Sequence, residues 1–296
     1  GIGRATAIAF ANEGANVILA DINLENATDT AKELADKDIK CWPYQLDVSD
    51  ISQIKSMIDF GKTNVTLENI VERLSTTPLC FQPGSSWRYG VSTDVLGRII
   101  EVVTGKHLES VFKERIFDPL EMEDTAFFVS ANKAHRLSGM YIPRNGGLLR
   151  TDNLGNSLGG SFLEKPAFLA GGHGLTSTAS DYMKFAQMHL NKVILNGTRI
   201  LSEEAIDLMR ENQLPEAVKE IGQPYPGNVF GLDFAVVDNS DAFQKVPVGT
   251  HWWWGIAGSW FWIDPVTETV FIGMIQNNDI LLSLQIHRAA RSAIYE

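Results

Sequence analysis

The sequence has little cysteine, no long hydrophobic run and no excess of positive charge. Its two cysteines, Cys41 and Cys80, cannot form a disulfide framework, so we expect a reducing, cytoplasmic compartment. No apolar stretch approaches the roughly 20 residues that span a bilayer. Lys plus Arg number 25 against 36 for Asp plus Glu, a net charge of −11. Because nucleic acids and anionic membranes recruit basic surfaces, neither is expected as a partner.

What remains is the composition of an ordinary globular chain. Hydrophobic residues make up 44% of the 296 residues and charged residues 21%, enough for one large domain or two smaller ones. No Cys/His cluster has the spacing of metal ligands, so no metal site is expected. The chain opens Gly1-Ile2-Gly3-Arg4, without Met or a signal peptide. We therefore expect the natural N-terminus to lie upstream of Gly1, and the oligomeric state stays open.

Helices and strands alternate in residues 1–60. Apolar spacing predicts helices over 5–12, 24–34 and 51–58 and short buried strands over 17–20 and 41–44. This order is typical of a parallel α/β sheet. The segment is therefore expected to be an α/β fragment, a partial Rossmann fold that lacks its first strand.

Several residues of this segment resemble the short-chain dehydrogenase/reductase family. Gly1-Ile2-Gly3-Arg4 resembles the end of its dinucleotide loop, where glycines let backbone N–H groups approach a pyrophosphate. Asp21 stands at the position of the family's ribose-binding acid, and Asp47-Val48 resembles its adenine-side pair. The resemblance implies an NAD(P) site, with Gly1, Gly3, Asp21, Asp47 and Val48 as its cofactor-binding residues.

The family's catalytic Tyr-x-x-x-Lys motif is missing. The residues four places after the tyrosines that could carry it are Val48, Thr93, Asn145, Ala186 and Val229, and none is lysine. Dehydrogenase chemistry is therefore not expected, since a fold fragment does not carry a site. A nicotinamide-dependent oxidoreductase fragment stays as an alternative.

Residues 61–296 change in character from helices to strands. Helices are expected over 67–74, 92–103, 108–116, 179–190 and 280–294, and strands over 230–237, 258–263 and 270–276. Thr66 is a candidate N-cap and Gly105 a candidate helix stop. Helices followed by an antiparallel sheet predict an α+β domain.

Four phrases in this part resemble the serine β-lactamase and penicillin-binding-protein-like superfamily, most closely its esterase-type members. They are Pro83–Gly90 with Asp94–Arg98, Asp118–Thr125, Gly171–Thr178, and Trp253–Ser259 with Trp262–Pro265. Four phrases in the family's order make this a specific resemblance. The chain is thus expected to be a chimera of a dehydrogenase-like segment, 1–60, and a β-lactamase-like domain, 61–296.

The resemblance implies a serine hydrolase that needs no cofactor. In this family a Ser is activated by a Lys one helical turn later, in Ser-x-x-Lys, and a Tyr shares the proton relay. Tyr89 matches that Tyr, and Trp253-Trp254-Gly255 resembles the strand motif that flanks the substrate and helps to form the oxyanion hole. A packing role beside Trp87 is the alternative for Tyr89.

Two departures bear on the substrate. Val91 stands where β-lactamases usually have Asn, and Trp253 replaces the Lys that attracts a β-lactam carboxylate. Both favour a neutral acyl ester of a small molecule over an anionic antibiotic. A tryptophan-lined wall suits apolar acyl or aryl groups, so a non-catalytic acyl- or aryl-binding protein is a further alternative.

The nucleophile is not identified. Ser-x-x-Lys occurs as Ser52/Lys55, Ser110/Lys113 and Ser130/Lys133, and three matches in one chain show how unspecific the pattern is. Ser52/Lys55 is kept as a candidate because it is the one pair upstream of Tyr89. It is a weak candidate, because its position also fits the solvated face of a helix. We expect the nucleophile region to be missing, the chain to be inactive and its stability to be low. His173 and His251 are expected to be structural or surface residues, because no Gly-x-Ser-x-Gly elbow accompanies them.

Overall fold

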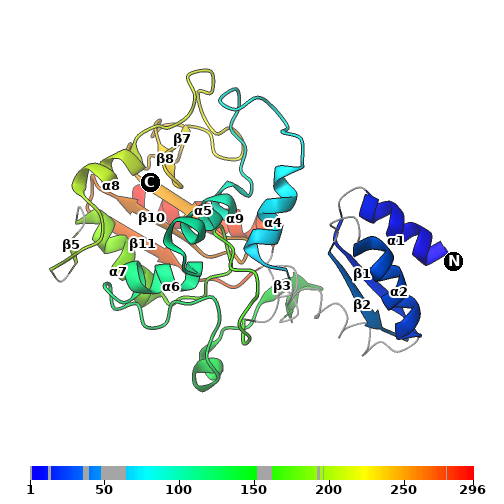
Figure 1. The fold of residues 1–296 in the computed structure, drawn as a ribbon. Helices are drawn as coiled ribbons and strands as arrows, with labels where there is room; N and C mark the ends of the chain where they lie inside the picture. The colour runs from blue at the N-terminus through cyan, green and yellow to red at the C-terminus, as the bar shows by residue number, and fades with distance from the viewer. Residues whose placement is uncertain are drawn as a thin grey trace. The chain divides into compact units, whose positions relative to one another are not determined.

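The computed structural model describes residues 2–12, 15–35, 40–47, 65–151, 162–191, 194–195, 197–277 and 279–296. The chain forms two compact units, Gly1–Thr77 and Pro78–Glu296 (Figure 1). The boundary expected between residues 60 and 61 lies outside the described residues, as does the helix expected over 51–58.

The first unit alternates helices and strands: α1 (Ile2–Asn12), β1 (Val17–Asp21), α2 (Leu24–Ala35) and β2 (Cys41–Gln45). β1 and β2 pair in parallel, from Val17 opposite Cys41 to Asp21 opposite Gln45. A parallel pair needs a crossover between its strands, and α2 supplies it.

The core of this unit is built from small and branched residues. On α2, Ala27, Ala31 and Leu34 recur at helical spacing and are buried, and Leu34 is fully buried. They pack with Ala11 of α1 and Leu19 of β1. Alanines at these positions allow the helices to approach the strands closely, so a short sheet still acquires an apolar core.

Helix α4 (Leu67–Ser75) also groups with the first unit. Its start is set by a capping box, in which the Asn69 backbone N–H donates to Thr66 Oγ1 over 3.3 Å and the Thr66 N–H donates to Asn69 Oδ1 over 3.2 Å. Two of the four N–H groups that a helix start leaves unpaired are thus satisfied. The expected cap at Thr66 is therefore observed.

The second unit is organised around a five-stranded antiparallel sheet of order β11-β10-β9-β8-β7. Its strands are β7 (Asn228–Phe230), β8 (Ala235–Val237), β9 (His251–Trp254), β10 (Trp260–Asp264) and β11 (Thr269–Gly273). Each strand pairs with its neighbour in sequence, as in an antiparallel meander (Figure 1). The single strand expected over 230–237 is wrong: a tight turn splits it, with Asp233 at φ +68°.

Helices pack on this sheet in two apolar clusters, and Trp253 contacts both. On β10, Trp260 and Trp262 contact a cluster that includes Ile286 and Ala290 of α9 (Ile280–Tyr295). Phe261 and Ile263 instead contact a cluster that includes Tyr182 and Phe185 of α7 (Ala179–Leu190). Alternate residues of a strand point to opposite faces, so β10 is buried on both sides.

The remaining elements of the second unit surround this core. They are α5 (Ser92–Thr104), α6 (Leu108–Phe112) with a π-helical continuation (Lys113–Phe117), a 3₁₀ turn (Ala131–Arg136), α8 (Glu203–Arg210), and the hairpins β3 (Tyr141–Arg144)–β4 (Gly147–Arg150) and β5 (Ile194–Leu195)–β6 (Thr198–Arg199). α5 ends at Gly105, whose φ of +65° is the left-handed conformation that glycine adopts most easily. None of the described helices is long and apolar enough to cross a membrane.

Candidate functional site

Tyr89 and Trp253, which belong to two phrases far apart in the sequence, lie against each other in the second unit. Tyr89 stands in the loop before α5, and Trp253 lies on β9. Their ring centroids are 5.2 Å apart. Tyr89 remains 60% exposed. The structure therefore brings together the predicted proton-relay residue and the predicted substrate-flanking strand.

Two further aromatic rings extend this contact into a continuous row. Phe230 of β7 lies 5.4 Å from Trp253, nearly edge to face, and Trp87 lies 4.9 Å from Phe230. We call Trp87, Phe230, Trp253 and Tyr89 the aromatic row. Rings in such contact present a large and rigid apolar surface. Phe230 was not predicted from the sequence, because it looked like an ordinary strand residue.

The end of β9 is held by its own turn and by one loop tyrosine. The Gly255 backbone N–H donates to the Ser259 carbonyl over 2.8 Å, so it is engaged in the β9–β10 turn and is not directed at a ligand. The Trp254 indole Nε1–H donates to the Tyr225 hydroxyl. Of the motif Trp253-Trp254-Gly255, Trp253 is thus the residue that joins the aromatic row.

The glycine-rich loop at 171–174 makes a close backbone contact with the start of α5. A Cβ atom on Gly171 would lie 2.0 Å from the Thr93 carbonyl oxygen, so a larger residue is excluded there. The Gly172 N–H donates to the buried Asp94 carboxylate over 3.2 Å. These glycines therefore fix the loop against α5, near the Tyr89 loop in sequence.

The Ser110/Lys113 pair does not have the geometry of a nucleophile and its base. Ser110 lies in α6, and Lys113 begins the π-helical continuation. The Lys113 ammonium is paired with the Asp118 carboxylate. The Lys113 ammonium is thus directed at Asp118 and not at the Ser110 hydroxyl, which a lysine base would have to contact.

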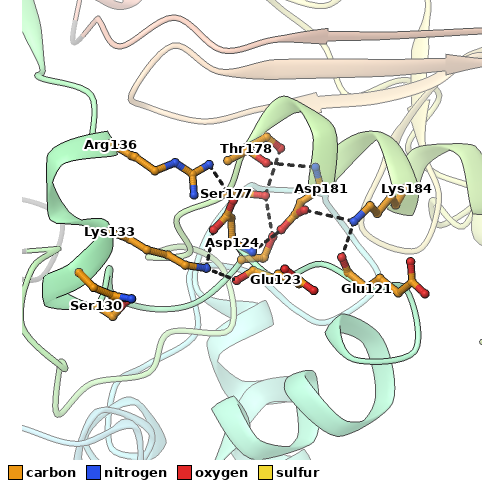
Figure 2. Close-up of polar contacts among 12 residues, drawn as sticks. Glu121, Glu123, Asp124, Ser130, Lys133, Arg136, Ser177, Thr178, Asp181 and Lys184 are labelled. Carbon is orange, nitrogen blue, oxygen red and sulfur yellow. Dashed lines mark hydrogen bonds and ion pairs between the residues drawn. The ribbon is translucent and has the colours of Figure 1, made fainter.

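The Ser130/Lys133 pair is engaged in a polar cluster, shown in Figure 2. Lys133 Nζ donates to Asp124 Oδ1 over 2.6 Å and to the Glu123 carbonyl over 2.9 Å, and Ser130 Oγ donates to Asn132 Oδ1 over 2.7 Å. The two side chains thus bind different partners. Lys133 serves as a charged anchor for Asp124, and not as a base for Ser130.

This polar cluster connects the first turn of α7 to the loop that contains Asp124 and Thr125. Asp181 of α7 accepts the Asp124 N–H over 2.6 Å and the Thr125 hydroxyl over 3.1 Å, and its own N–H donates to Thr178 Oγ1 (Figure 2). Hydrogen bonds from Arg136 and then Lys133 lower the pKa of Asp124 to about 2. The cluster is therefore a structural anchor, in which Lys133 and Arg136 pair with the Asp124 carboxylate.

The remaining candidate pair, Ser52 and Lys55, lies outside the described residues, as do Gly1 and Val48. Gly3 lies in the first turn of α1. Asp21 ends β1, and its Oδ1 accepts the Asn23 N–H over 2.9 Å in a local turn. Asp47 follows β2. Because β1 and β2 are parallel, Asp21 at the end of β1 and Asp47 two residues after β2 both lie toward the carboxyl ends of the strands.

The histidines have no catalytic arrangement among the described residues. His251 on β9 is fully buried, and its ring centroid lies 6.0 Å from that of His189 on α7. His173 contacts the Phe168 ring at 5.8 Å. Within the described ranges no group of three or more His, Cys, Asp or Glu side chains is placed to hold a metal ion.

The comparisons with known proteins agree with the second unit's architecture. A family model described as Beta-lactamase matches residues 31–291. Protein Rv1367c of Mycobacterium tuberculosis is 34% identical over 212 residues, which are 69% of this chain and 52% of that protein. Lovastatin esterase of Penicillium rubens is 35% identical over 150 residues, 50% of this chain and 36% of the esterase. The chain spans about half the length of the first of these relatives.

A solved structure extends the likeness to the fold. EstCE1, a hydrolase with promiscuous acyltransferase activity, superposes with a TM-score of 0.67 at 24% identity, covering 79% of this chain and 62% of that one. A reductase of Thermotoga maritima, 3-oxoacyl-[acyl-carrier-protein] reductase FabG, matches a short stretch of 74 residues at 40% identity, 23% of this chain and 30% of the reductase. The Beta-lactamase model begins at residue 31, inside the segment expected to be dehydrogenase-like, so the chimera stays a prediction. The chain belongs to the Beta-lactamase family.

Proposed function

We propose that this chain carries the substrate-flanking side of an esterase-type hydrolase site that accepts neutral acyl esters of small molecules. The observation that supports it is the contact between Tyr89 and Trp253, with ring centroids 5.2 Å apart. The two residues come from separate phrases of the family and meet at one exposed place. Relatives whose names include an esterase and a hydrolase with acyltransferase activity point the same way.

In the reaction that the family performs, a serine Oγ attacks the ester carbonyl while a neutral lysine and the tyrosine take its proton. The tetrahedral intermediate collapses, the alcohol leaves with a proton returned by the tyrosine, and water then releases the acid from the acyl-serine. Tyr89 is the residue proposed for this relay. Side chains alone carry this chemistry, so the proposal invokes no cofactor.

The preference for a neutral acyl group follows from the aromatic row. Trp253 stands where β-lactamases have a lysine, so an anionic substrate loses its ion pair there. The neighbouring Phe230 and Trp87 rings extend an apolar surface from that position. Packing against such rings favours the binding of apolar acyl or aryl groups, whereas removing a carboxylate from water costs free energy.

The proposal includes the expectation that this chain does not turn over esters. Both Ser-x-x-Lys pairs among the described residues have their lysine in an ion pair with a carboxylate. Ser52/Lys55 is the weak candidate that remains. A fluorophosphonate probe is therefore expected to leave the chain unlabelled; labelling that disappears in Ser52→Ala would instead identify Ser52 as the nucleophile.

Binding tests the site without requiring turnover. Phenyl butyrate is expected to quench the tryptophan fluorescence saturably, with at least fivefold weaker binding in Trp253→Ala, because an aromatic contact contributes about 1 kcal/mol beyond its buried area. Benzylpenicillin, an anion, is expected to bind more weakly than phenyl butyrate. Equal affinity for the two ligands, or an unchanged affinity in Trp253→Ala, would contradict the proposal and leave a purely structural role for these tryptophans.

A second candidate concerns residues 1–60, which we propose derive from a short-chain dehydrogenase/reductase. It is supported by the parallel β1–β2 pair with its crossover helix α2 and by Asp21 at the carboxyl end of β1. Without a Tyr-x-x-x-Lys motif, no dehydrogenase activity is expected. NADH titration followed by fluorescence tests it: saturable micromolar binding that Asp21→Ala removes would revive a nicotinamide-dependent function.

A further inference from the structure

Tyr225 lies beside the aromatic row and has no role in the chemistry proposed so far. It stands in the loop before β7, half-buried, with its ring 5.1 Å from Trp252, edge to face, and 6.1 Å from Trp253. Tyr89 contacts the same Trp253 ring at 5.2 Å. The two tyrosines therefore contact one indole, and they are close enough to interact electrostatically.

The hydrogen bonds of Tyr225 leave its own proton uncommitted. A phenol oxygen accepts through its lone pairs and donates one proton, whereas an indole N–H can only donate. In its contact with Trp254 Nε1 the Tyr225 hydroxyl is therefore the acceptor. Among the described residues no carbonyl or carboxylate accepts the Tyr225 proton in return. Trp254 thus fixes the phenol oxygen and leaves it as a donor.

The electrostatic surroundings of Tyr225 also favour a protonated phenol that can donate a hydrogen bond. Burial raises the pKa of Tyr225 above its ordinary value, so the phenol keeps its proton at neutral pH. The nearby Arg291 guanidinium lies 4.4 Å over the Phe243 ring and 5.8 Å over the Trp252 ring. Within the described part of the chain its Nε donates to Gln244 Oε1 over 3.0 Å, and it has no carboxylate partner. Beside the Tyr225 hydroxyl and the Arg291 guanidinium, a ligand oxygen that accepts a hydrogen bond is therefore more favourable than a ligand group that donates one.

We propose that Tyr225 determines specificity, its hydroxyl donating a hydrogen bond to a neutral oxygen acceptor on the acyl or aryl group that packs against Trp253. This inference rests on the proposed esterase-type function and names its substrate class: esters whose apolar part carries a ketone, ether or hydroxyl oxygen. The hydroxyl acts by binding, and it takes no part in the relay assigned to Tyr89.

Benzylacetone and its isosteric methylene analogue, in which CH₂ replaces the carbonyl oxygen, test the proposal by fluorescence titration of the full chain. Benzylacetone is expected to bind about fivefold more tightly, as one net hydrogen bond predicts. In Tyr225→Phe, which keeps the ring, this preference is expected to vanish while the affinity for the methylene analogue stays unchanged. With ¹³C-labelled benzylacetone, the carbonyl resonance is expected to move downfield on binding the wild type and to lose that movement in Tyr225→Phe.

The outcomes separate this inference from the function on which it rests. If both ligands bind equally to the wild type and Trp253→Ala weakens both, the aromatic row binds apolar groups and the role of Tyr225 is overturned. If neither ligand binds, the proposed site and the inference both fail. Tighter binding of hydrocinnamate, the carboxylate analogue, would overturn the neutral acceptor and assign the place to an anion. A variant that misfolds does not rescue the proposal, because the ligand comparison and the carbonyl shift are made on the wild type.

Discussion

His189 and His251 are buried side by side in an apolar surrounding, although both can carry charge. Their rings lie among Phe185 of α7 and Phe234 between β7 and β8, at 4.7 Å from His189 and 5.4 Å from His251 respectively. Burial and then the Arg210 charge of α8 lower the pKa of His189 to about 4, and burial and then the charges of His189 and Arg210 lower that of His251 to about 3. Both residues are therefore neutral in the fold near pH 7. Because the two rings are neutral in the fold and can be protonated on unfolding, they make the stability of the second unit depend on pH.

We predict that the second unit loses stability as the pH falls below about 6.5. The unfolded state takes up protons at an ordinary histidine pKa near 6.5, while the folded state does not until about pH 3 to 4, so acid favours unfolding. Each histidine is expected to contribute about 2 kcal/mol to the loss between pH 6.5 and 5, since one pKa unit is about 1.4 kcal/mol. Urea unfolding at the two pH values measures it.

Two variants separate this effect from the titration of carboxylates. His251→Asn is expected to be less stable at neutral pH but to lose less stability on acidification. His107→Asn is the matched control, because the His107 side chain is 86% exposed, and it is expected to behave as the wild type. The same loss of stability in the wild type and His251→Asn would show that the buried pair does not titrate on unfolding.

At the scale of elements, α5 combines a well-formed helix with an incompletely covered surface. Its N-terminal turn is fixed by the close contact between Thr93 and Gly171, and the buried Asp94 accepts the Gly172 N–H. Farther along, Leu96, Ile99, Val102 and Val103 are 55%, 50%, 64% and 79% exposed. Four large exposed apolar residues on one helix form more apolar surface than singly scattered residues do. Such a surface favours association.

We predict that the paired change Ile99→Lys and Val103→Lys lowers aggregation. Replacing two exposed apolar side chains removes attractive surface and costs little packing, so the free energy of unfolding is expected to change by less than about 0.5 kcal/mol. Binding of anilinonaphthalene sulfonate and light scattering measure the effect. Gln82→Lys with Ser86→Lys adds the same charge at exposed loop positions and is expected to leave both readouts nearly unchanged. An equal fall in scattering for both pairs would attribute the effect to net charge.

At the scale of the whole molecule, the described residues of the two units form separate cores. Leu34 is fully buried in the cluster of α1, β1 and α2, and Ile263 is fully buried between β10 and α7. Each unit then has its own free energy of unfolding, and the smaller unit buries a smaller share of its surface. The first unit is therefore expected to be the less stable one.

We predict two thermal transitions in calorimetry. Leu34→Ala, expected to cost about 2–5 kcal/mol, lowers or abolishes the earlier transition and leaves the later one in place. Ile263→Ala, an equally buried aliphatic residue, is expected to do the reverse. One cooperative transition that both variants lower alike would contradict the independence of the units.

Local patterns carried much of the fold. Apolar spacing and caps were sufficient to predict α2, α5, α7 and α9, because these helices bury one stripe and start or end at recognisable residues. The strand expected over 230–237 failed, because the turn through Gly231 and Asp233 depends on packing against the end of α8, where a Cβ on Gly231 would lie 2.1 Å from the Met209 carbonyl oxygen. Such a close approach leaves no periodic trace in the sequence.

The sequence by itself determined the family, the order of the elements and the identity of Tyr89 and Trp253 as candidate site residues, since these depend on contiguous phrases. Only the tertiary structure decided which side chains meet. It placed Phe230 and Tyr225 beside Trp253, tied Lys113 and Lys133 into ion pairs, and engaged the Gly255 N–H in a turn. The physical reason is that a site is made of contacts between distant segments, and their geometry is set by the packing of the sheet and its helices, which no local spacing encodes.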